Sequence, residues 1–223
     1  MTNETSSVFV VDDDLAVRSA LRRLLVAAGY QVQALSSTKH LFEEGRPDSP
    51  CCLVLDVGLP DVDGLAFQEA LGRAGVDVPI IFITGRGDIP MSVRAMKAGA
   101  VDFLAKPFDR SQLLACVSLA LTRDAESLVR QRQLTGLKQR YATLSPRECE
   151  VFAAVASGML NKQVGFELGV VEKTIKVHRA HVMEKMQAVA LADLVRMADL
   201  LGIRWTVDGA IGLPEPGDVA SYA

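Results

Sequence analysis

The first 120 residues alternate short apolar segments with longer stretches in which apolar residues recur every three or four positions. The short segments predict strands, and several are apolar at every position, as strands buried on both faces of a parallel sheet must be. They cover residues 8–11, 31–35, 52–55, 80–84 and 103–105. The longer stretches predict helices at 15–28, 38–44, 65–74 and 89–98, followed by a fifth helix that begins near Asp109. Alternating strands and helices predict a doubly wound α/β domain with a five-stranded parallel sheet.

The pattern from Leu144 onward predicts an all-α domain of four short helices. Ser145-Pro146-Arg147-Glu148 has the form of a capping box at the start of the first helix, which ends near Gly158. The other helices are predicted at 161–168, 172–186 and 191–201. Two short helices joined by a glycine-containing turn are typical of a helix-turn-helix, whose second helix enters the major groove of DNA.

The segment between these parts is compatible with a helix. Residues 110–139 contain no proline and one glycine, and Leu114, Leu121 and Leu128 are seven residues apart. This spacing fits a fifth helix that continues as a coiled-coil-like connector, and a polar helical linker fits equally well. We therefore predict a domain at 7–121, a helical linker at 122–142, a helix-turn-helix domain at 143–204 and a disordered tail at 205–223.

Composition narrows the class of protein. The chain has 49% hydrophobic, 23% charged and 5% aromatic residues, which excludes collagen-like and wholly disordered chains. The sequence lacks an apolar run long enough for a membrane span, and its N-terminus has an acid where a signal peptide has a basic region. We expect a cytoplasmic protein with no membrane partner. Its four cysteines form no CxxC pair and are expected to be buried as small apolar residues.

The net charge of −3 conceals an acidic first half and a slightly basic second half. Bases cluster in the predicted helix 172–186, where Lys173, Lys176, Arg179 and Lys185 occur together with His178 and His181. Such a cluster indicates nucleic-acid binding only weakly, because a helix of mixed charge is more often a solvated surface.

Functional groups follow four of the predicted strands. Asp12, Asp13 and Asp14 follow the first strand and Asp56 the third, while Thr84 ends the fourth strand and Lys106 follows the fifth. The carboxyl ends of parallel strands meet at one edge of the sheet, where ligands bind. Carboxylates gathered there repel one another unless a cation is present, and Mg²⁺ is the cation that suits them. A lysine and a hydroxyl suit a phosphoryl group that a carboxylate accepts. Each aspartate could instead cap a helix, which is the interpretation we favour for Asp14.

These residues resemble a known family in order and spacing. Val10-Val11-Asp12-Asp13-Asp14, Leu55-Asp56, Leu59-Pro60-Asp61-Val62-Asp63-Gly64, Ile83-Thr84-Gly85 and Ala105-Lys106-Pro107-Phe108 resemble the receiver domain of two-component response regulators. Ser145 to Glu148, Asn161-Lys162-Gln163, Lys173 to Arg179 and Ala192-Asp193-Leu194 resemble the DNA-binding domain of the NarL/FixJ type. Residues 87–100 are similar to the FixJ branch, and the resemblance covers residues 7 to about 203.

The resemblance implies a role for each residue of the receiver motif. Asp56 would be the phosphoacceptor, and Mg²⁺ would be held by Asp56, Asp13, Asp12 through water, and the Gly58 carbonyl. Lys106 would bind a phosphoryl oxygen, and its peptide bond to Pro107 would be cis. Thr84 and Phe103 would move together as a switch upon phosphorylation.

In the second domain, Lys176, Val177 and Arg179 are expected to reach base edges, while Lys162, Thr174 and Lys185 hold phosphates. Two departures from the family pattern stand out. Val171 replaces a capping serine, and Gly165 replaces an alanine, which should weaken its helix by about 1 kcal/mol.

The function expected from the resemblance is that of a transcriptional response regulator. A sensor histidine kinase, promoter DNA, RNA polymerase and, after phosphorylation, a second copy of the chain are its expected partners. A phosphohydrolase of the haloacid dehalogenase type is the alternative, but it needs an aspartate where Gly58 stands. A pure protein-interaction module on DNA would leave Lys106 and the acidic pair unexplained.

Overall fold

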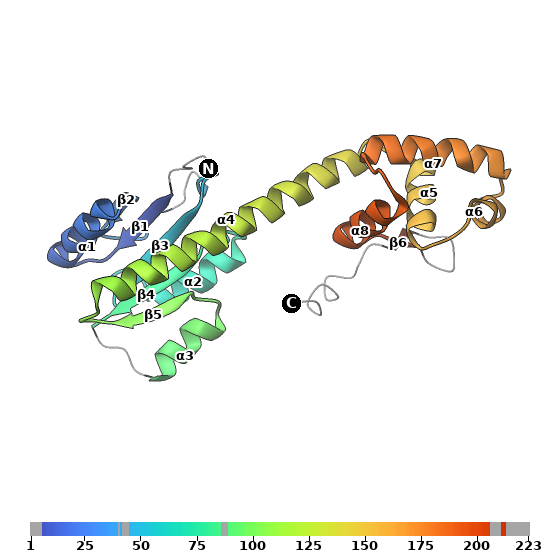
Figure 1. Ribbon diagram of the computed structural model, residues 1–223. Coiled ribbons are helices and arrows are strands. Elements are labelled where there is room, and N and C mark those ends of the chain that lie inside the picture. Colours follow the sequence, from blue (N-terminus) through green and yellow to red (C-terminus); the bar gives the residue numbers. More distant parts are fainter. Residues whose placement is uncertain (1–5, 40, 42–44, 86–88, 206–210, 213–223) are drawn as a thin grey trace. The chain divides into compact units, whose positions relative to one another are not determined.

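The computed structural model describes residues 6–39, 41, 45–85, 89–205 and 211–212, which form two compact units, 1–129 and 130–223 (Figure 1). The elements of the first unit are β1 (Ser7–Val11), α1 (Leu15–Ala27), β2 (Gln31–Leu35), β3 (Cys51–Asp56), α2 (Gly64–Arg73), β4 (Ile80–Thr84), α3 (Ile89–Lys97) and β5 (Asp102–Ala105). The helix α4 (Arg110–Tyr141) follows β5 and continues into the second unit.

The five strands are parallel and lie in the order β2-β1-β3-β4-β5 (Figure 1). Alternate side chains of β1 enter two cores because successive residues of a strand point to opposite faces. Val8 and Val10 pack with apolar residues of α1 and α4, whereas Phe9 and Val11 pack with those of α2 and α3. Helices therefore cover both faces of the sheet, which confirms the predicted doubly wound fold.

The predicted helix at 38–44 is wrong over its described part. Thr38, Lys39 and Leu41 form a turn, in which the Leu41 amide donates to the Thr38 carbonyl at 3.0 Å. Residues 40 and 42–44 lie outside the described residues. Thr38 and Leu41 are both buried, so packing against the rest of the domain outweighs the local helical spacing at these positions.

The linker predicted at 122–142 continues the last helix of the preceding domain, and the two together form α4. The first unit includes α4 as far as Val129. Asp124, only 1% exposed, lies on this part of α4. Its Oδ2 accepts hydrogen bonds from Arg46 Nη2 at 2.7 Å and from the Cys51 amide at 2.8 Å. This ion pair attaches α4 to the amino-terminal edge of the sheet, so residues beyond 121 belong to the first unit.

The leucines spaced by seven do not form an exposed coiled-coil seam. Leu121 belongs to the core between the sheet and α4, Leu128 is also buried, and Leu114 packs against that core. Their spacing therefore reflects packing within the chain, and the coiled-coil hypothesis for this segment is wrong.

The second unit consists of α5 (Pro146–Ala156), α6 (Asn161–Glu167), α7 (Glu172–Met186), α8 (Leu191–Leu201) and a two-residue ladder between β6 (Arg204–Trp205) and β7 (Ile211–Gly212). The predicted capping box is present, with Ser145 at the N-cap of α5 and Glu148 at N3. Val151, Phe152, Ile175 and other apolar residues form the core between these helices. Within the predicted disordered tail, the described residues 205 and 211–212 are paired strands, and the remainder lies outside the described residues.

Gly165 allows α6 to lie against the turn that leads into α7. A Cβ atom at this position would lie 2.7 Å from the carbonyl oxygen of Val170, a distance at which backbone must move. The Val170 amide also donates to the Gly165 carbonyl at 2.9 Å, so the two segments are held together. The expectation that glycine only weakens α6 is therefore incomplete, because the missing side chain permits this close approach.

We expect Gly165→Ala to lower the free energy of unfolding, or to leave it unchanged, although the higher helix propensity of alanine would by itself raise it. Gly136→Ala is the matched control, since Gly136 lies within α4 and its Cβ would meet nothing within 4 Å. That control should raise stability by up to about 1 kcal/mol. Urea unfolding of both variants decides the matter, and equal stabilisation by the two substitutions would contradict the close approach at Gly165.

Candidate phosphoacceptor site and DNA-binding surface

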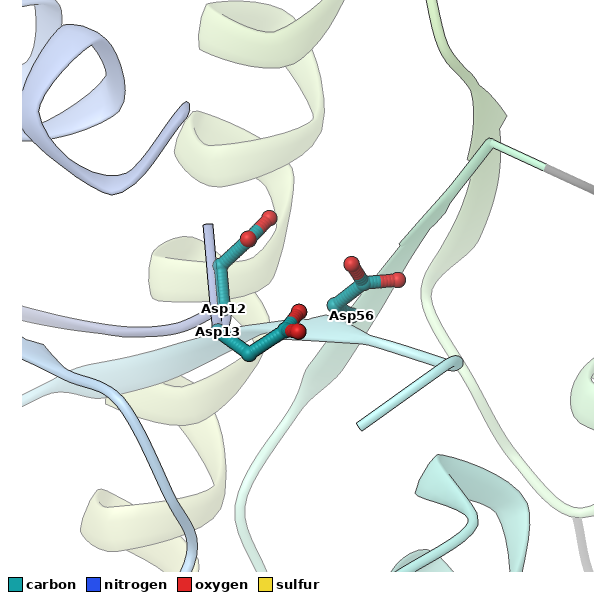
Figure 2. Close-up of side chains that lie close together, drawn as sticks. All are labelled: Asp12, Asp13 and Asp56. Atoms are coloured by element: carbon teal, nitrogen blue, oxygen red, sulfur yellow. The ribbon is translucent and has the colours of Figure 1, made fainter. Parts of the chain in front are cut away.

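The residues that follow the strands meet at the carboxyl-terminal edge of the sheet. Asp12 and Asp13 follow β1, and Asp56 is the last residue of β3. One carboxylate oxygen from each of the three lies within 4.8 Å of the other two (Figure 2). Lys106, which follows β5, completes the group with its ammonium, so residues distant in the sequence share one site.

Asp12 is fully buried, and its polar atoms are all engaged. Its Oδ1 accepts from the Asp14 amide at 2.9 Å, and its Oδ2 accepts from Lys106 Nζ at 2.7 Å. Its backbone amide donates to the Leu35 carbonyl, and its backbone carbonyl accepts from Arg18 Nη1 at 2.6 Å. These four contacts hold the Asp12 carboxylate in one orientation.

Lys106 also binds Asp56, with 2.9 Å between Nζ and Oδ2. Burial alone would lower the pKa of the Lys106 ammonium, but its hydrogen bonds to Asp12 and Asp56 outweigh that effect and raise the pKa above its ordinary value. The ammonium is therefore charged at neutral pH, and it offsets part of the repulsion between the carboxylates.

The site has the composition that a Mg²⁺ ion requires. Asp13 is exposed, and within the described part of the chain no hydrogen-bond donor contacts its carboxylate. Three carboxylates share a single ammonium, so negative charge remains for a hard cation that prefers oxygen ligands. Asp12, Asp13, Asp56 and the Gly58 carbonyl are the groups that would hold it.

The predicted switch residues adjoin this site. Thr84 ends β4 and is buried, and its carbonyl accepts from the Lys106 amide at 2.7 Å. Phe103, on β5, is half-buried with its ring 6.3 Å from that of Phe82. The Lys106–Pro107 peptide bond is cis, as the resemblance implied.

Two glycines shape the backbone near Asp56. The Gly58 amide donates to Asp56 Oδ1 at 3.2 Å, and among the described residues a Cβ at Gly58 would meet nothing within 4 Å. A Cβ at Gly64, in contrast, would lie 3.0 Å from the Asp56 carbonyl oxygen. Asp14 caps α1 by accepting from the amides of Ala16 and Val17, which confirms the interpretation favoured for it.

Sequence reasoning missed Arg18. Its guanidinium contacts the backbone of Asp12 and Asp13, but a basic residue on an amphipathic helix gives no signal of such a contact. Only the fold brings the side chain back over the end of β1.

The proposed DNA-contacting residues differ in their surroundings. Lys162 is exposed on α6, while Lys176 and Val177 are exposed on α7, and Val177 is 51% exposed despite being apolar. Thr174 is half-buried near the start of α7, and Ile175 is part of the core as predicted. Val171 provides no side-chain cap for α7, as expected from the missing serine.

Two of the predicted DNA contacts bind other parts of the same unit. Arg179 Nη1 donates to Asn161 Oδ1 at 3.2 Å, which links α7 to α6. Lys185 Nζ lies 2.6 Å from Glu148 Oε2. The hydrogen bond from Lys185, followed by that from the Ser145 amide, lowers the pKa of Glu148 to about 2. The structure thus gives Arg179 and Lys185 partners within the same unit, while Lys176 pairs with Glu172 of its own helix at 3.0 Å.

The end of α4 contacts the end of α7. Arg140 Nη1 donates to the Met186 carbonyl at 3.0 Å and to Gln187 Oε1 at 3.4 Å. Cations stabilise the carboxyl end of a helix because its last carbonyls lack partners. This contact was also missed by sequence reasoning, since an arginine 46 residues away gives no local signal.

A receiver-type acidic site on a doubly wound sheet, joined to a helix-turn-helix unit, defines the class of response regulators. Residues 8–118 match the model of the response regulator receiver domain, and residues 142–198 match that of the bacterial regulatory proteins of the luxR family. The chain belongs to the family of response regulators that combine these two domains.

Several proteins are similar over most of the chain. Nodulation protein W of Bradyrhizobium diazoefficiens is 51% identical over 88% of this chain and 86% of that protein. Transcriptional regulatory protein FixJ of Azorhizobium caulinodans is 40% identical over 90% of this chain and 95% of that protein. The structure of response regulator StyR is 42% identical, covers 87% of this chain and 98% of that one, and superposes with a TM-score of 0.77. The predicted relation to FixJ-type regulators is confirmed. Within the described residues, no helix has the length and apolarity needed to cross a membrane.

Asp56→Asn should abolish phosphate incorporation while the fold persists. The neutral amide removes the acceptor oxygen but also relieves repulsion from the neighbouring carboxylates, so the melting temperature should hold or rise. Lys106 keeps its contact with Asp12 in this variant. Intact mass after incubation with acetyl phosphate and Mg²⁺, together with thermal unfolding, tests both parts. A phosphate gained by the variant would show that another residue is the acceptor.

Proposed function

We propose that the chain accepts a phosphoryl group on Asp56 from a sensor histidine kinase and then regulates transcription as a dimer bound to promoter DNA. The observation that carries this proposal is the position of Asp56, a buried carboxylate with Lys106 at 2.9 Å and two further aspartates beside it. It would act in the cytoplasm, where its DNA is, with RNA polymerase as a further partner.

The arrangement suits transfer of a phosphoryl group between two nucleophiles. The phosphorus–nitrogen bond of a phosphohistidine breaks as an Asp56 oxygen forms its bond to phosphorus. Lys106 would move its ammonium from Asp56 to a phosphoryl oxygen, and Thr84, the last residue of β4, would turn its hydroxyl toward another oxygen of the same group. A bound Mg²⁺ would neutralise charge on the transferred group and orient it.

The phosphohydrolase alternative is disfavoured by the same geometry. Such an enzyme needs an acid/base two residues after its nucleophile, and Gly58 offers only its backbone there. Without a residue that activates water at this position, a stable phosphoaspartate fits a regulator better than rapid turnover does.

The surface proposed for dimerisation is the exposed side of α3. Ile89, Val93 and Met96 are 80%, 45% and 46% exposed, and their spacing of four and three places them on one side of the helix. The helix packs against β5, the strand that carries Phe103 and precedes Lys106. A movement of Phe103 or Lys106 at the phosphoacceptor site would therefore reach α3 and its apolar surface through β5.

Dimerisation would also compensate for weak DNA binding by a single domain. The bases of α7 are partly offset by Glu172 and Glu184 on the same helix, so a single domain should bind DNA weakly at physiological salt. Two domains on adjacent half-sites gain affinity through effective concentration without any new contact in either domain.

We expect acetyl phosphate and Mg²⁺ to add one lasting phosphate to the wild-type chain and to convert it from monomer to dimer. Val93→Asp should accept the phosphate but remain monomeric, because the charge lies in the proposed interface. Val26→Asp, at a valine of similar exposure on α1, is the matched control and should dimerise normally. Intact mass and sedimentation velocity measure the two effects. Steady release of phosphate would indicate the hydrolase, and a phosphorylated monomer that binds DNA tightly would contradict the dimer.

Lys176→Ala should reduce discrimination between specific and random DNA, whereas Lys162→Ala should weaken binding to both alike. The exposed pair of Lys176 with Glu172 is worth only about 0.3–0.5 kcal/mol, so the lysine is free to contact DNA. A bidentate base contact gives about 1–3 kcal/mol of discrimination, and a phosphate contact lowers the salt slope by about one unit.

The measurement uses a duplex selected from a random pool by the phosphorylated chain, titrated at several salt concentrations beside a scrambled duplex. Lys138→Ala, a removed charge at an exposed position of α4, serves as the control. Equal losses on the two duplexes for Lys176→Ala would reassign that lysine to the phosphates.

A further inference from the structure

Arg18 lies in the first turn of α1, directly behind the acidic segment that follows β1. Its Nη1 is 2.6 Å from the backbone carbonyl oxygen of Asp12 and 3.3 Å from that of Asp13. Its own amide donates to the Asp14 carbonyl at 2.9 Å. One residue therefore binds the backbone carbonyls of three consecutive aspartates.

The acidic segment Asp12-Asp13-Asp14 is stabilised by a cation that binds its backbone. Three adjacent acids place negative charge on their side chains, while their carbonyl oxygens point back toward α1. The Arg18 guanidinium is permanently charged, and its Nη1 carries two hydrogens, so this one nitrogen can donate to both neighbouring carbonyls while it supplies positive charge. The backbone angles of Asp12 and Asp13 are thereby held, and these angles determine where the two carboxylates point.

The consequence is clearest for Asp13. Asp12 is also held through its side chain by Lys106 and the Asp14 amide, but among the described residues no donor holds the Asp13 carboxylate. Its position near Asp56 thus depends on the backbone, and in Figure 2 the Asp13 carboxylate is directed toward Asp56. The only side chain among the described residues that binds the Asp13 backbone is Arg18.

We propose that Arg18 is a positioning residue of the Mg²⁺ site, which holds the backbone of Asp12 and Asp13 so that their carboxylates converge with that of Asp56. This inference rests on the proposed function, because that function requires the cation site. Arg18 contacts only backbone oxygens there and contributes no ligand atom.

Two effects of Arg18 on cation affinity oppose each other. Its positive charge disfavours a nearby cation, whereas its hold on the backbone preorganises the ligands. Groups that orient metal ligands typically change metal affinity by roughly 10–100-fold when they are removed. If positioning dominates, loss of the guanidinium weakens Mg²⁺ binding, and if charge dominates, it strengthens binding. The sign of the change therefore tests the proposal.

The experiment measures Mg²⁺ affinity of the full-length chain by isothermal titration calorimetry. Arg18→Met keeps the aliphatic stem but removes every donor, and it should raise the Mg²⁺ Kd about tenfold or more. Arg22→Ala is the matched control, because Arg22 is an exposed base one turn further along α1, and its Kd should change less than about twofold. Arg18→Lys keeps the charge but replaces the guanidinium with an ammonium on a shorter side chain, and it should give an intermediate Kd.

A purely structural role for Arg18 is separated by thermal unfolding in EDTA, which should change far less than the Mg²⁺ affinity. An affinity of Arg18→Met that equals or exceeds that of the wild type would overturn the proposal. If Arg18→Met does not fold, Arg18→Lys decides, and a wild-type Kd in that variant would count against positioning by the guanidinium. Asp13→Asn identifies the site itself. A wild-type chain that binds no Mg²⁺, or an Asp13→Asn variant that binds it normally, would overturn the proposed cation site and this inference together, whereas failure of Arg18→Met alone leaves the proposed function standing.

Discussion

The ammonium of Lys106 bridges two buried carboxylates, Asp12 at 2.7 Å and Asp56 at 2.9 Å, and this bridge makes the acidic edge of the sheet possible. Carboxylates taken out of water at short separation repel one another strongly unless a positive charge lies between them. The bridge also links the ends of the first, third and fifth strands. Any group that takes the place of Asp56 as the partner of Lys106 therefore changes the contact that links these three strand ends.

The same rule holds for two buried carboxylates elsewhere in the described part of the chain. Asp124 is buried against Arg46 and the Cys51 amide, and this pair attaches the long helix α4 to the opposite edge of the sheet. Glu148 in the second unit closes the capping box of α5 and also binds Lys185 of α7. Each of these buried carboxylates thus has a cation from a part of the chain that is distant in the sequence. Removal of one partner would leave an uncompensated buried charge, which is why these contacts specify how elements pack.

Periodicity predicted most elements because strands and helices expose their apolar residues at different intervals. Prediction failed where tertiary contacts outweighed local pattern. The segment at 38–44 had helical spacing but forms a turn in its described part. Gly165 was interpreted through helix propensity alone, although its missing side chain permits contact with the Val170 carbonyl. The seven-residue spacing of leucines suggested a coiled coil, whereas Leu121 and Leu128 are buried within the chain itself.

The sequence by itself determined the class of fold, the strand ends that carry Asp12, Asp56, Thr84 and Lys106, and the capping box at Ser145. Those features depend on local pattern and on the parallel order of strands, which places all carboxyl ends on one edge. Only the tertiary structure decided which partners the charged side chains take. Arg18 turns back onto its own loop, and Arg179 and Lys185 take partners within the helix-turn-helix unit. A long basic side chain can reach several partners, and the packed positions of its neighbours select among them.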